Sequence, residues 1–155
     1  MENWEVDLRN TKDYTLLGDI GEAIALHYLS SHGFFIVTRP IKFLHGELFL
    51  ISAHYQIKPP KMDRAHWLTD KQKEYLENFP SWDYVAFKAE GKPWEEHYIR
   101  RPYLIEVKTV KGEGKPHKKP NSNSVFEAKA LGFKPILLVV KLFENWNILI
   151  EANEI

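Results

Sequence analysis

The sequence predicts a single α/β domain in which helices flank a mixed β-sheet. Three observations predict this class. Along the 155 residues, helical patterns alternate with short apolar stretches rich in β-branched and aromatic residues. The strand patterns at 81–89 and 98–110 are joined by a short turn, which favours antiparallel pairing. A helical pattern then leads to a buried strand pattern, which is typical of a crossover between parallel strands.

The composition excludes several classes of protein. The chain has no cysteine, which rules out disulfides, iron–sulfur clusters and cysteine-bound zinc and fits a cytoplasmic location. Its 21 basic and 21 acidic residues balance, so any phosphate binding depends on local charge. No apolar run approaches the roughly 20 residues of a membrane span, and the N-terminus lacks the apolar core of a signal peptide.

The first helix is predicted from about residue 15 to 32, where apolar residues recur at helical spacing. Gly18 and Gly21 lie inside this pattern, and each weakens a helix by about 1 kcal/mol relative to alanine. We therefore expect both glycines to have a packing reason, such as close approach to a sheet.

Two strand patterns and a second helix follow. The first strand, Phe34–Thr38, is expected to end at Arg39-Pro40, and the next spans about 46–55. The second helix begins with a capping box at Thr69 and continues to about Phe79. The stretch from about 40 to 80 is interpreted as an insertion within the single domain 1–155.

The strands at 81–89 and 98–110 form a predicted hairpin around the turn-prone segment 90–93. A register centred between Trp94 and Glu95 places Asp83 opposite Glu106, with Cβ atoms about 4.5–5.5 Å apart. Two carboxylates at that separation repel each other unless a cation lies between them.

The last third of the chain supplies the crossover. After the glycine- and proline-bearing loop 111–123, Ser124 and Glu127 form a second capping box that opens a helix ending at Leu131. The apolar run 135–140 predicts a strand buried on both faces, and 146–150 an edge strand.

The segment Glu106-Val107-Lys108 carries the chemistry. In a strand, Glu106 and Lys108 point to the same face, so a carboxylate and an ammonium lie side by side. Asp83, Glu106 and the Val107 carbonyl offer the oxygen ligands that magnesium prefers. Lys108 could then orient or deprotonate a bound water, as a metal-assisted phosphodiesterase requires. The alternative is an ordinary salt bridge on a solvated sheet face, worth about 0–1 kcal/mol.

The acid-x-Lys tripeptide alone is a weak signal, because it occurs four times, starting at Glu90, Glu106, Glu113 and Glu127. Only the copy at Glu106 lies in a predicted strand that follows a strand bearing an aspartate. The context, rather than the tripeptide, supports the hypothesis of a magnesium-dependent nuclease.

From Gly18 to about Ile150 the order of elements resembles the PD-(D/E)xK nuclease superfamily, which has the restriction-endonuclease-like fold. Within it, the chain is most similar to small Holliday junction resolvases and Mrr- or RecB-like nucleases. The resemblance rests on Gly21-Glu22-Ala23, Trp82-Asp83-Tyr84-Val85 and Ile105-Glu106-Val107-Lys108-Thr109. It implies a deoxyribonuclease that uses Mg²⁺, or Mn²⁺ in its place. Asp83, Glu106 and Glu22 would then be metal ligands, and Lys108 the catalytic lysine. Lys129 matches a position that often carries a polar site residue.

Two features depart from that pattern. Trp82-Asp83 stands where the family has Pro-Asp, which is tolerated variation. The second departure concerns another strand. Gly46-Glu47-Leu48-Phe49-Leu50-Ile51 resembles a strand that carries the catalytic aspartate in some relatives, with Phe49 in its place. If this strand lay beside Glu106, the site would lack its aspartate, and the chain would be a catalytically silent nucleic-acid-binding or scaffold subunit. We favour Asp83 because its strand immediately precedes the Glu106 strand.

A lysine-rich segment follows the motif and is the candidate DNA-binding region, although a plain solvated loop has the same composition. RNA remains an alternative substrate, and the edge strand at 146–150 could form a homodimer interface. Tryptophans could stack on bases, but most aromatic residues in a domain of this size belong to the core. The candidate DNA-binding lysines are Lys111, Lys115, Lys118, Lys119 and Lys129. The tryptophans that could stack on bases are Trp67, Trp82, Trp94 and Trp146.

Overall fold

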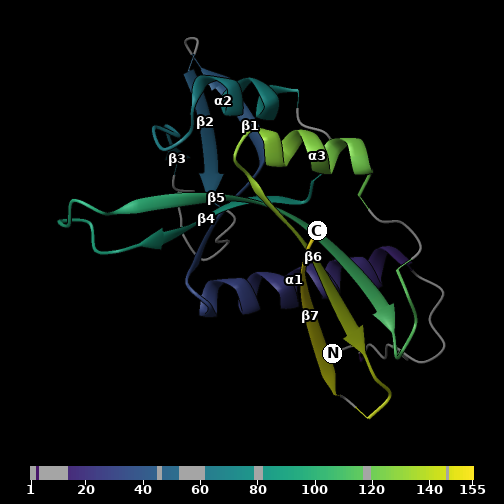
Figure 1. Ribbon diagram of the computed structural model, residues 1–155. Coiled ribbons are helices and arrows are strands. Elements are labelled where there is room, and N and C mark those ends of the chain that lie inside the picture. The colour runs from purple at the N-terminus through teal and green to yellow at the C-terminus, as the bar shows by residue number, and fades with distance from the viewer. Residues whose placement is uncertain are drawn as a thin grey trace.

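A seven-stranded mixed sheet organises the chain (Figure 1). The computed structural model describes residue 3 and residues 14–44, 47–52, 62–78, 82–116, 120–145 and 147–155. The elements are α1 (Tyr14–Ser31), β1 (Phe34–Leu44), β2 (Glu47–Ser52), β3 (Met62–Asp63), α2 (Asp70–Glu77), β4 (Tyr84–Glu90), β5 (Ile99–Lys111), α3 (Ser122–Ala130), β6 (Lys134–Leu142) and β7 (Ile148–Glu154). The strand order is β3-β2-β1-β4-β5-β6-β7, with β5 and β6 parallel and the other neighbours antiparallel. The predicted α/β class and mixed sheet are confirmed.

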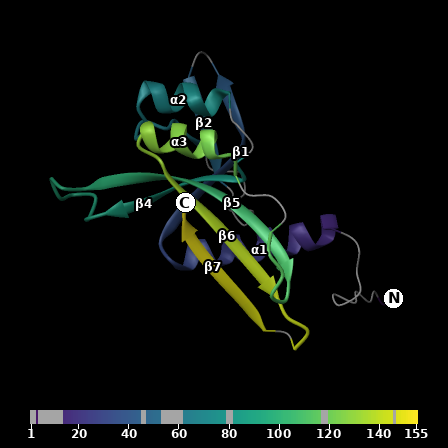
Figure 2. The ribbon, with the colours of Figure 1, turned by 45° about the vertical axis from the view of Figure 1, so that its right-hand side comes forward.

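Helices cover both faces of the sheet, with α1 on one side and α2 and α3 on the other (Figures 1 and 2). Two hydrophobic cores result, one on each face. Because side chains alternate along a strand, β5 contributes to both: Leu104 packs in the core beneath α2 and α3, and Ile105 packs in the core beneath α1. None of the helices in the described ranges is long and apolar enough to span a membrane.

The hairpin register is as predicted from Tyr84 onward, but Asp83 and Glu106 are not among the paired residues. Tyr84 lies opposite Ile105 and Lys88 opposite Arg101, so the antiparallel pairing has the predicted centre. The Asp83 N–H donates to the Ile105 carbonyl at 3.0 Å, which extends the pairing by one hydrogen bond. The strand itself begins at Tyr84 rather than at Ser81, so Asp83 lies immediately before it.

The predicted end of the first strand at Arg39-Pro40 is wrong, because β1 continues to Leu44. Its pairing with β2 shifts register between Thr38 and Lys42. A proline removes one ladder hydrogen bond, and a bulge accommodates that loss without ending the strand.

The segment between β1 and β4, interpreted from the sequence as an insertion, contains β2, β3 and α2. β1 pairs directly with β4 over residues 34–38, whereas β2 and β3 extend the sheet outward from the other edge of β1. The capping box of α2 is present, with Thr69 and Gln72 exchanging both bonds. The helix ends at Glu77, and Phe79 lies outside the described residues.

The predicted start of the third helix is also wrong. α3 begins at Ser122 with Asn121 as its N-cap, whose side chain accepts the Asn123 N–H at 2.8 Å. Ser124 therefore lies within the first turn and does not cap the helix. The helix leads into β6, whose residues 135–140 are all buried, and β7 closes the sheet as an edge strand. The buried strand is as predicted, and the edge strand is present but spans Ile148–Glu154 rather than 146–150.

Candidate functional site

The candidate site lies at the N-terminal end of β4, where the neighbouring strand β5 continues past it. β4 begins opposite Ile105, whereas β5 extends to Lys111 alongside β6. In a strand, the N–H and C=O of every second residue face the same neighbour. The Ile105 carbonyl and the Val107 N–H both bond Asp83, so the Val107 carbonyl also faces the end of β4.

Asp83 is held in place from both sides. Its Oδ2 accepts the Val107 N–H at 2.7 Å, in addition to the backbone bond between Asp83 and Ile105. The preceding Trp82 is only 2% exposed, and its indole N–H donates to the Tyr75 hydroxyl at 3.0 Å. The carboxylate is therefore fixed at the edge of β5 by the core beneath α2.

Glu106 and Lys108 form the predicted side-by-side pair. The Lys108 Nζ lies 2.9 Å from Glu106 Oε1, and the two side chains are 29% and 12% exposed, respectively. The Glu106 side chain is therefore largely shielded from water, whereas the Lys108 side chain is partly exposed. A carboxylate so far removed from water stays ionised only when a cation or several donors compensate for its lost hydration.

Glu22 lies on the helix that packs against the other face of the sheet. A Cβ placed on Gly21 would come within 1.6 Å of Thr109 Oγ1, so α1 touches β5 directly at this point. Glu22, the next residue, is half-buried. However, the residues that the structure describes contain no group of three or more Asp, Glu, His or Cys side chains able to hold a metal ion. Glu22 thus does not close a three-acid cluster with Asp83 and Glu106.

The strand next to Glu106 is the one that carries Asp83. β2, with Phe49, pairs with β1 and β3, so β1 and β4 separate it from β5. The choice of Asp83 over the Phe49 strand is confirmed as a statement about topology.

The predicted phosphate-binding lysines are dispersed. Lys111 is the exposed last residue of β5, Lys115 is exposed in the following loop, and Lys129 is exposed in the last turn of α3. Lys118 and Lys119 lie outside the described residues. The structure therefore gathers Asp83, Val107, Glu106 and Lys108 at one place, and the described lysines of the predicted set, Lys111, Lys115 and Lys129, are exposed on other segments.

Lys141 on β6 is a half-buried lysine that lies outside the candidate site, and the sequence analysis did not single it out. Val139 lies opposite Lys108, and Lys141 is two residues further along the same face. Its Nζ lies 3.0 Å from Glu151 and 3.5 Å from Glu113, and the hydrogen bond to Glu151 raises the pKa of Lys141 above its ordinary value. The available signal was a lysine directly after the apolar run 135–140.

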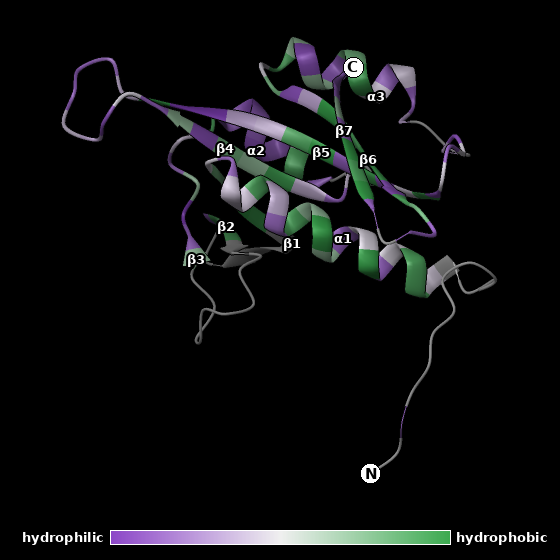
Figure 3. Ribbon diagram, turned by 90° about the horizontal axis from the view of Figure 1, so that it is seen from below, coloured by the Kyte–Doolittle hydropathy of each residue, from purple (hydrophilic) through white to green (hydrophobic). Residues whose placement is uncertain are grey.

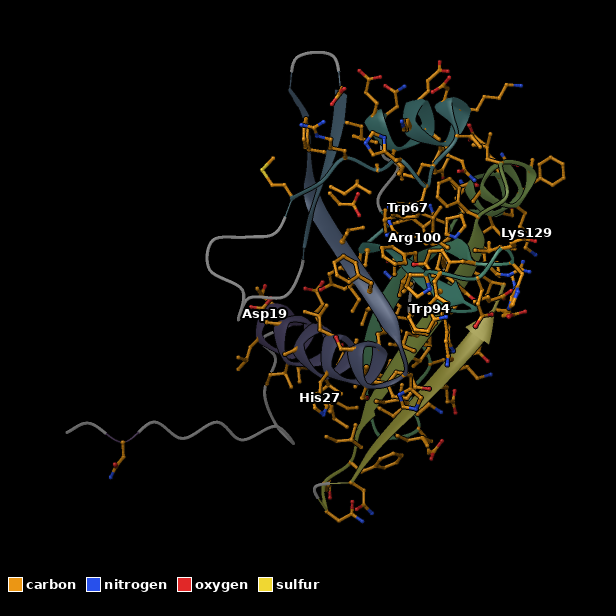
Figure 4. All side chains as sticks on the ribbon, turned by 90° about the vertical axis from the view of Figure 1, so that its left-hand side faces the viewer. Asp19, His27, Trp67, Trp94, Arg100 and Lys129 are labelled. Carbon is orange, nitrogen blue, oxygen red and sulfur yellow. The ribbon has the colours of Figure 1, made fainter. Side chains whose placement is uncertain are left out.

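The tryptophans divide between core and surface. Trp82 belongs to the core, Trp67 is half-buried, and Trp94 is 78% exposed; Trp146 lies outside the described residues. Trp94 comes from the β4–β5 hairpin, which points toward the viewer in Figure 4.

The chain was compared with models of known protein families, with curated proteins and with solved structures, and none of the three comparisons gave a match.

Proposed function

We propose that this protein is a Mg²⁺-dependent nuclease of the PD-(D/E)xK type that hydrolyses phosphodiester bonds of DNA. The observation that carries the proposal is the arrangement at the end of β4. Asp83 accepts the N–H of Val107, which lies in the chain between the buried Glu106 and the half-buried Lys108. The residue before β4 thus supplies one carboxylate, and β5 supplies a second carboxylate, a carbonyl and an ammonium.

The donor set fits a hard divalent cation. Mg²⁺ takes oxygen ligands and is commonly held by one or two carboxylates together with water and substrate phosphate. Asp83, Glu106 and the Val107 carbonyl would hold it, and a carboxylate that accepts one N–H retains further lone pairs for a metal. Bound there, Mg²⁺ would neutralise charge on the phosphate and acidify a water molecule.

The protein's own contribution is orientation. The Val107 N–H fixes the rotation of the Asp83 carboxylate, and Glu106 holds the Lys108 ammonium within 2.9 Å. An ammonium in that position can orient the attacking water or stabilise the negative charge that develops on the phosphate. Low exposure of the pair strengthens these interactions, because less water screens them.

The order of elements supports the restriction-endonuclease-like assignment. Without the insertion, the chain runs helix, strand, strand preceded by an aspartate, strand with Glu-x-Lys, helix and parallel strand, namely α1, β1, β4, β5, α3 and β6. This is the order from which the resemblance was inferred. The insertion adds β2, β3 and α2 at the far edge of the sheet.

The test is metal-dependent cleavage of labelled duplex, single-stranded, flapped and four-way DNA with Mg²⁺ or Mn²⁺. We expect cleavage by the wild type and a loss of about 10²-fold or more in Lys108→Ala, the usual contribution of a positioned proton-transfer group. Asp83→Asn and Glu106→Gln, which keep the side-chain shape, should lose at least as much.

The chain offers a matched control for these variants. Lys141 and Glu151 form a second lysine–glutamate pair in the same sheet, with Nζ and Oε1 3.0 Å apart. Lys141→Ala and Glu151→Gln should leave cleavage within a few-fold of wild type. Equal cleavage by wild type, Lys108→Ala and Asp83→Asn would show that the assigned site is wrong.

A second candidate function is a catalytically silent nucleic-acid-binding or scaffold subunit. Two observations favour it: the described residues hold no three-acid group, and both carboxylates already have partners within the chain. Binding of DNA in EDTA with no cleavage in either metal would support this function over the first. A monomer in sedimentation would argue against symmetric cutting of a four-way junction.

A further inference from the structure

The outer part of the β4–β5 hairpin projects away from the helices, as Figures 1 and 2 both show. We call residues 88–101 the arm. Its two strands pair out to Glu90 opposite Ile99, and the connection between them forms the tip. In Figure 3 this outer part is largely hydrophilic, whereas the strands become hydrophobic where they enter the sheet.

The tip of the arm is an ordered turn that presents one tryptophan. Gly91 adopts φ +78°, which suits a residue without a side chain, and the Glu95 N–H bonds the Lys92 carbonyl at 2.8 Å. A second bond joins the Tyr98 N–H to the Glu95 carbonyl at 3.1 Å. Trp94 lies inside the first turn and is 78% exposed. A large aromatic ring is thus displayed on a backbone that is already folded.

One cation lies over this ring and another lies nearer the sheet. The Lys92 ammonium lies 5.4 Å from the centroid of Trp94. Nearer the sheet, the Arg100 guanidinium lies 4.9 Å from the centroid of Phe87, and its Nε donates to the Tyr98 hydroxyl at 3.1 Å. Neither Lys92 nor Arg100 pairs with a carboxylate among the described residues.

One acid of the arm is paired with a permanent cation, because Glu90 pairs with Arg101. Glu95 contacts His97, whose ring balances the carboxylate only when it is protonated, and Glu96 is exposed near the tip. With His97 neutral, the arm therefore has three cations without a carboxylate partner among the described residues, Lys88, Lys92 and Arg100, against the two carboxylates of Glu95 and Glu96.

We propose that the arm is a binding site for single-stranded nucleic acid, in which Trp94 stacks on an unpaired base and Lys92 and Arg100 contact the neighbouring phosphates. Sequence-tolerant binding of single strands commonly combines these two elements, an aromatic platform and flanking cations. A duplex conceals its base faces, so the exposed ring favours a single strand or a frayed branch. In linking the arm to cleavage, this inference rests on the proposed function.

The arm and the candidate site share one strand. Arg100 and Glu106 are both even-numbered residues of β5 and lie on the same face of that strand, six residues apart. At about 3.3 Å per residue this separation is about 20 Å. The arm would hold the substrate at about this distance from the bond that is cut.

The experiment measures binding in EDTA, so that cleavage plays no part. A fluorescein-labelled deoxythymidine strand of about 15 nucleotides, near the largest common site size, is titrated with the folded protein. We expect Trp94→Ala to weaken binding about 5- to 150-fold, the range for loss of one stacked base. Trp94→Phe should recover most of the affinity. Phe126→Ala is the matched control, because Phe126 is an aromatic residue on α3 that is 75% exposed.

Charge variants supply a second readout. Arg100→Ala should reduce the slope of log affinity against log salt by about 0.7, the value for one phosphate contact on a single strand. Arg64→Ala, which removes an exposed arginine outside the arm, should leave the slope unchanged. Glu96→Gln should tighten binding, since it removes one opposing charge.

The outcomes separate the two proposals. Three results would each refute the proposal that the arm binds single strands. The first is no binding by wild type at low salt, and the second is an equal loss of affinity in Trp94→Ala and Phe126→Ala. The third is the same loss for Trp94→Ala on a blunt duplex. Binding through Trp94 without metal-dependent cleavage would support the arm and refute the nuclease. Cleavage and binding that are both insensitive to Trp94→Ala would refute the arm alone.

Discussion

Two glycines in α1 allow a sharp test of how this helix meets the sheet. Gly18 and Gly21 lie one turn apart, and alanine at either position should favour the helix by about 1 kcal/mol. Their surroundings differ. A Cβ on Gly18 would have nothing within 4 Å, whereas a Cβ on Gly21 would lie 1.6 Å from Thr109 Oγ1 and 2.8 Å from Thr109 Cβ.

The opposite signs follow from these distances. Gly18→Ala should stabilise the protein by up to about 1 kcal/mol, because only the helix term changes. At Gly21 the helix must move away from β5, since rotating Thr109 cannot relieve the contact with its own Cβ. Overpacking of this kind costs about 1–3 kcal/mol, occasionally more, so Gly21→Ala should be destabilising overall.

Urea unfolding followed by circular dichroism measures both changes in the free energy of unfolding. Thr109→Ala in the Gly21→Ala background should recover part of the loss, because it removes Oγ1 and Cγ2 but keeps Cβ. The coupling between the two substitutions measures the contact directly. Equal stabilisation by Gly18→Ala and Gly21→Ala would refute the close packing of α1 on β5.

Two further predictions concern the groups around the site. Tyr75→Phe removes the acceptor of the buried Trp82 N–H and should lower the free energy of unfolding by about 1–3 kcal/mol, measured by urea unfolding; no change would show that Trp82 has another partner. Lys141 has its pKa raised, first by its hydrogen bond to Glu151 and also by Glu113. A raised folded pKa adds stability that is present below the unfolded value and is lost as pH rises past the folded one. Stability measured from about pH 9 to pH 12, across the ordinary lysine pKa, should therefore fall less steeply in Lys141→Gln than in wild type; parallel curves would contradict this reasoning.

The pairing of the two strands was predictable because they are neighbours in the sequence and are joined by a short connection. The register is a different matter. A shift by one residue would exchange Leu104 and Ile105 between the two cores and leave both buried, so alternation alone does not fix it. The observed pairing of Tyr84 with Ile105 has the predicted centre between Trp94 and Glu95.

The failures concern interactions that are weak or conditional. Pro40 predicts the end of a strand, but the bulge between Thr38 and Lys42 allows β1 to continue. Asn121 and Ser124 are both good caps, and the hydrogen bond from the Asn123 N–H to Asn121 shows which one is used. Asn and Ser are about equally favourable as N-caps, so the local sequence does not decide between them.

The candidate site shows a different limit of sequence reasoning. Alternation along β5 predicts that Glu106 and Lys108 share a face, but it cannot predict how much water that face sees. The structure makes the Glu106 side chain 12% exposed, and that figure distinguishes this pair from the exposed pair between Glu90 and Arg101. A pair in water contributes about 0–1 kcal/mol, whereas a buried carboxylate left without its lysine would be strongly unfavourable. Lys108→Ala should therefore lower stability as well as activity, and a bound divalent cation that restored the lost stability would show that the carboxylates at the end of β4 can accept a metal.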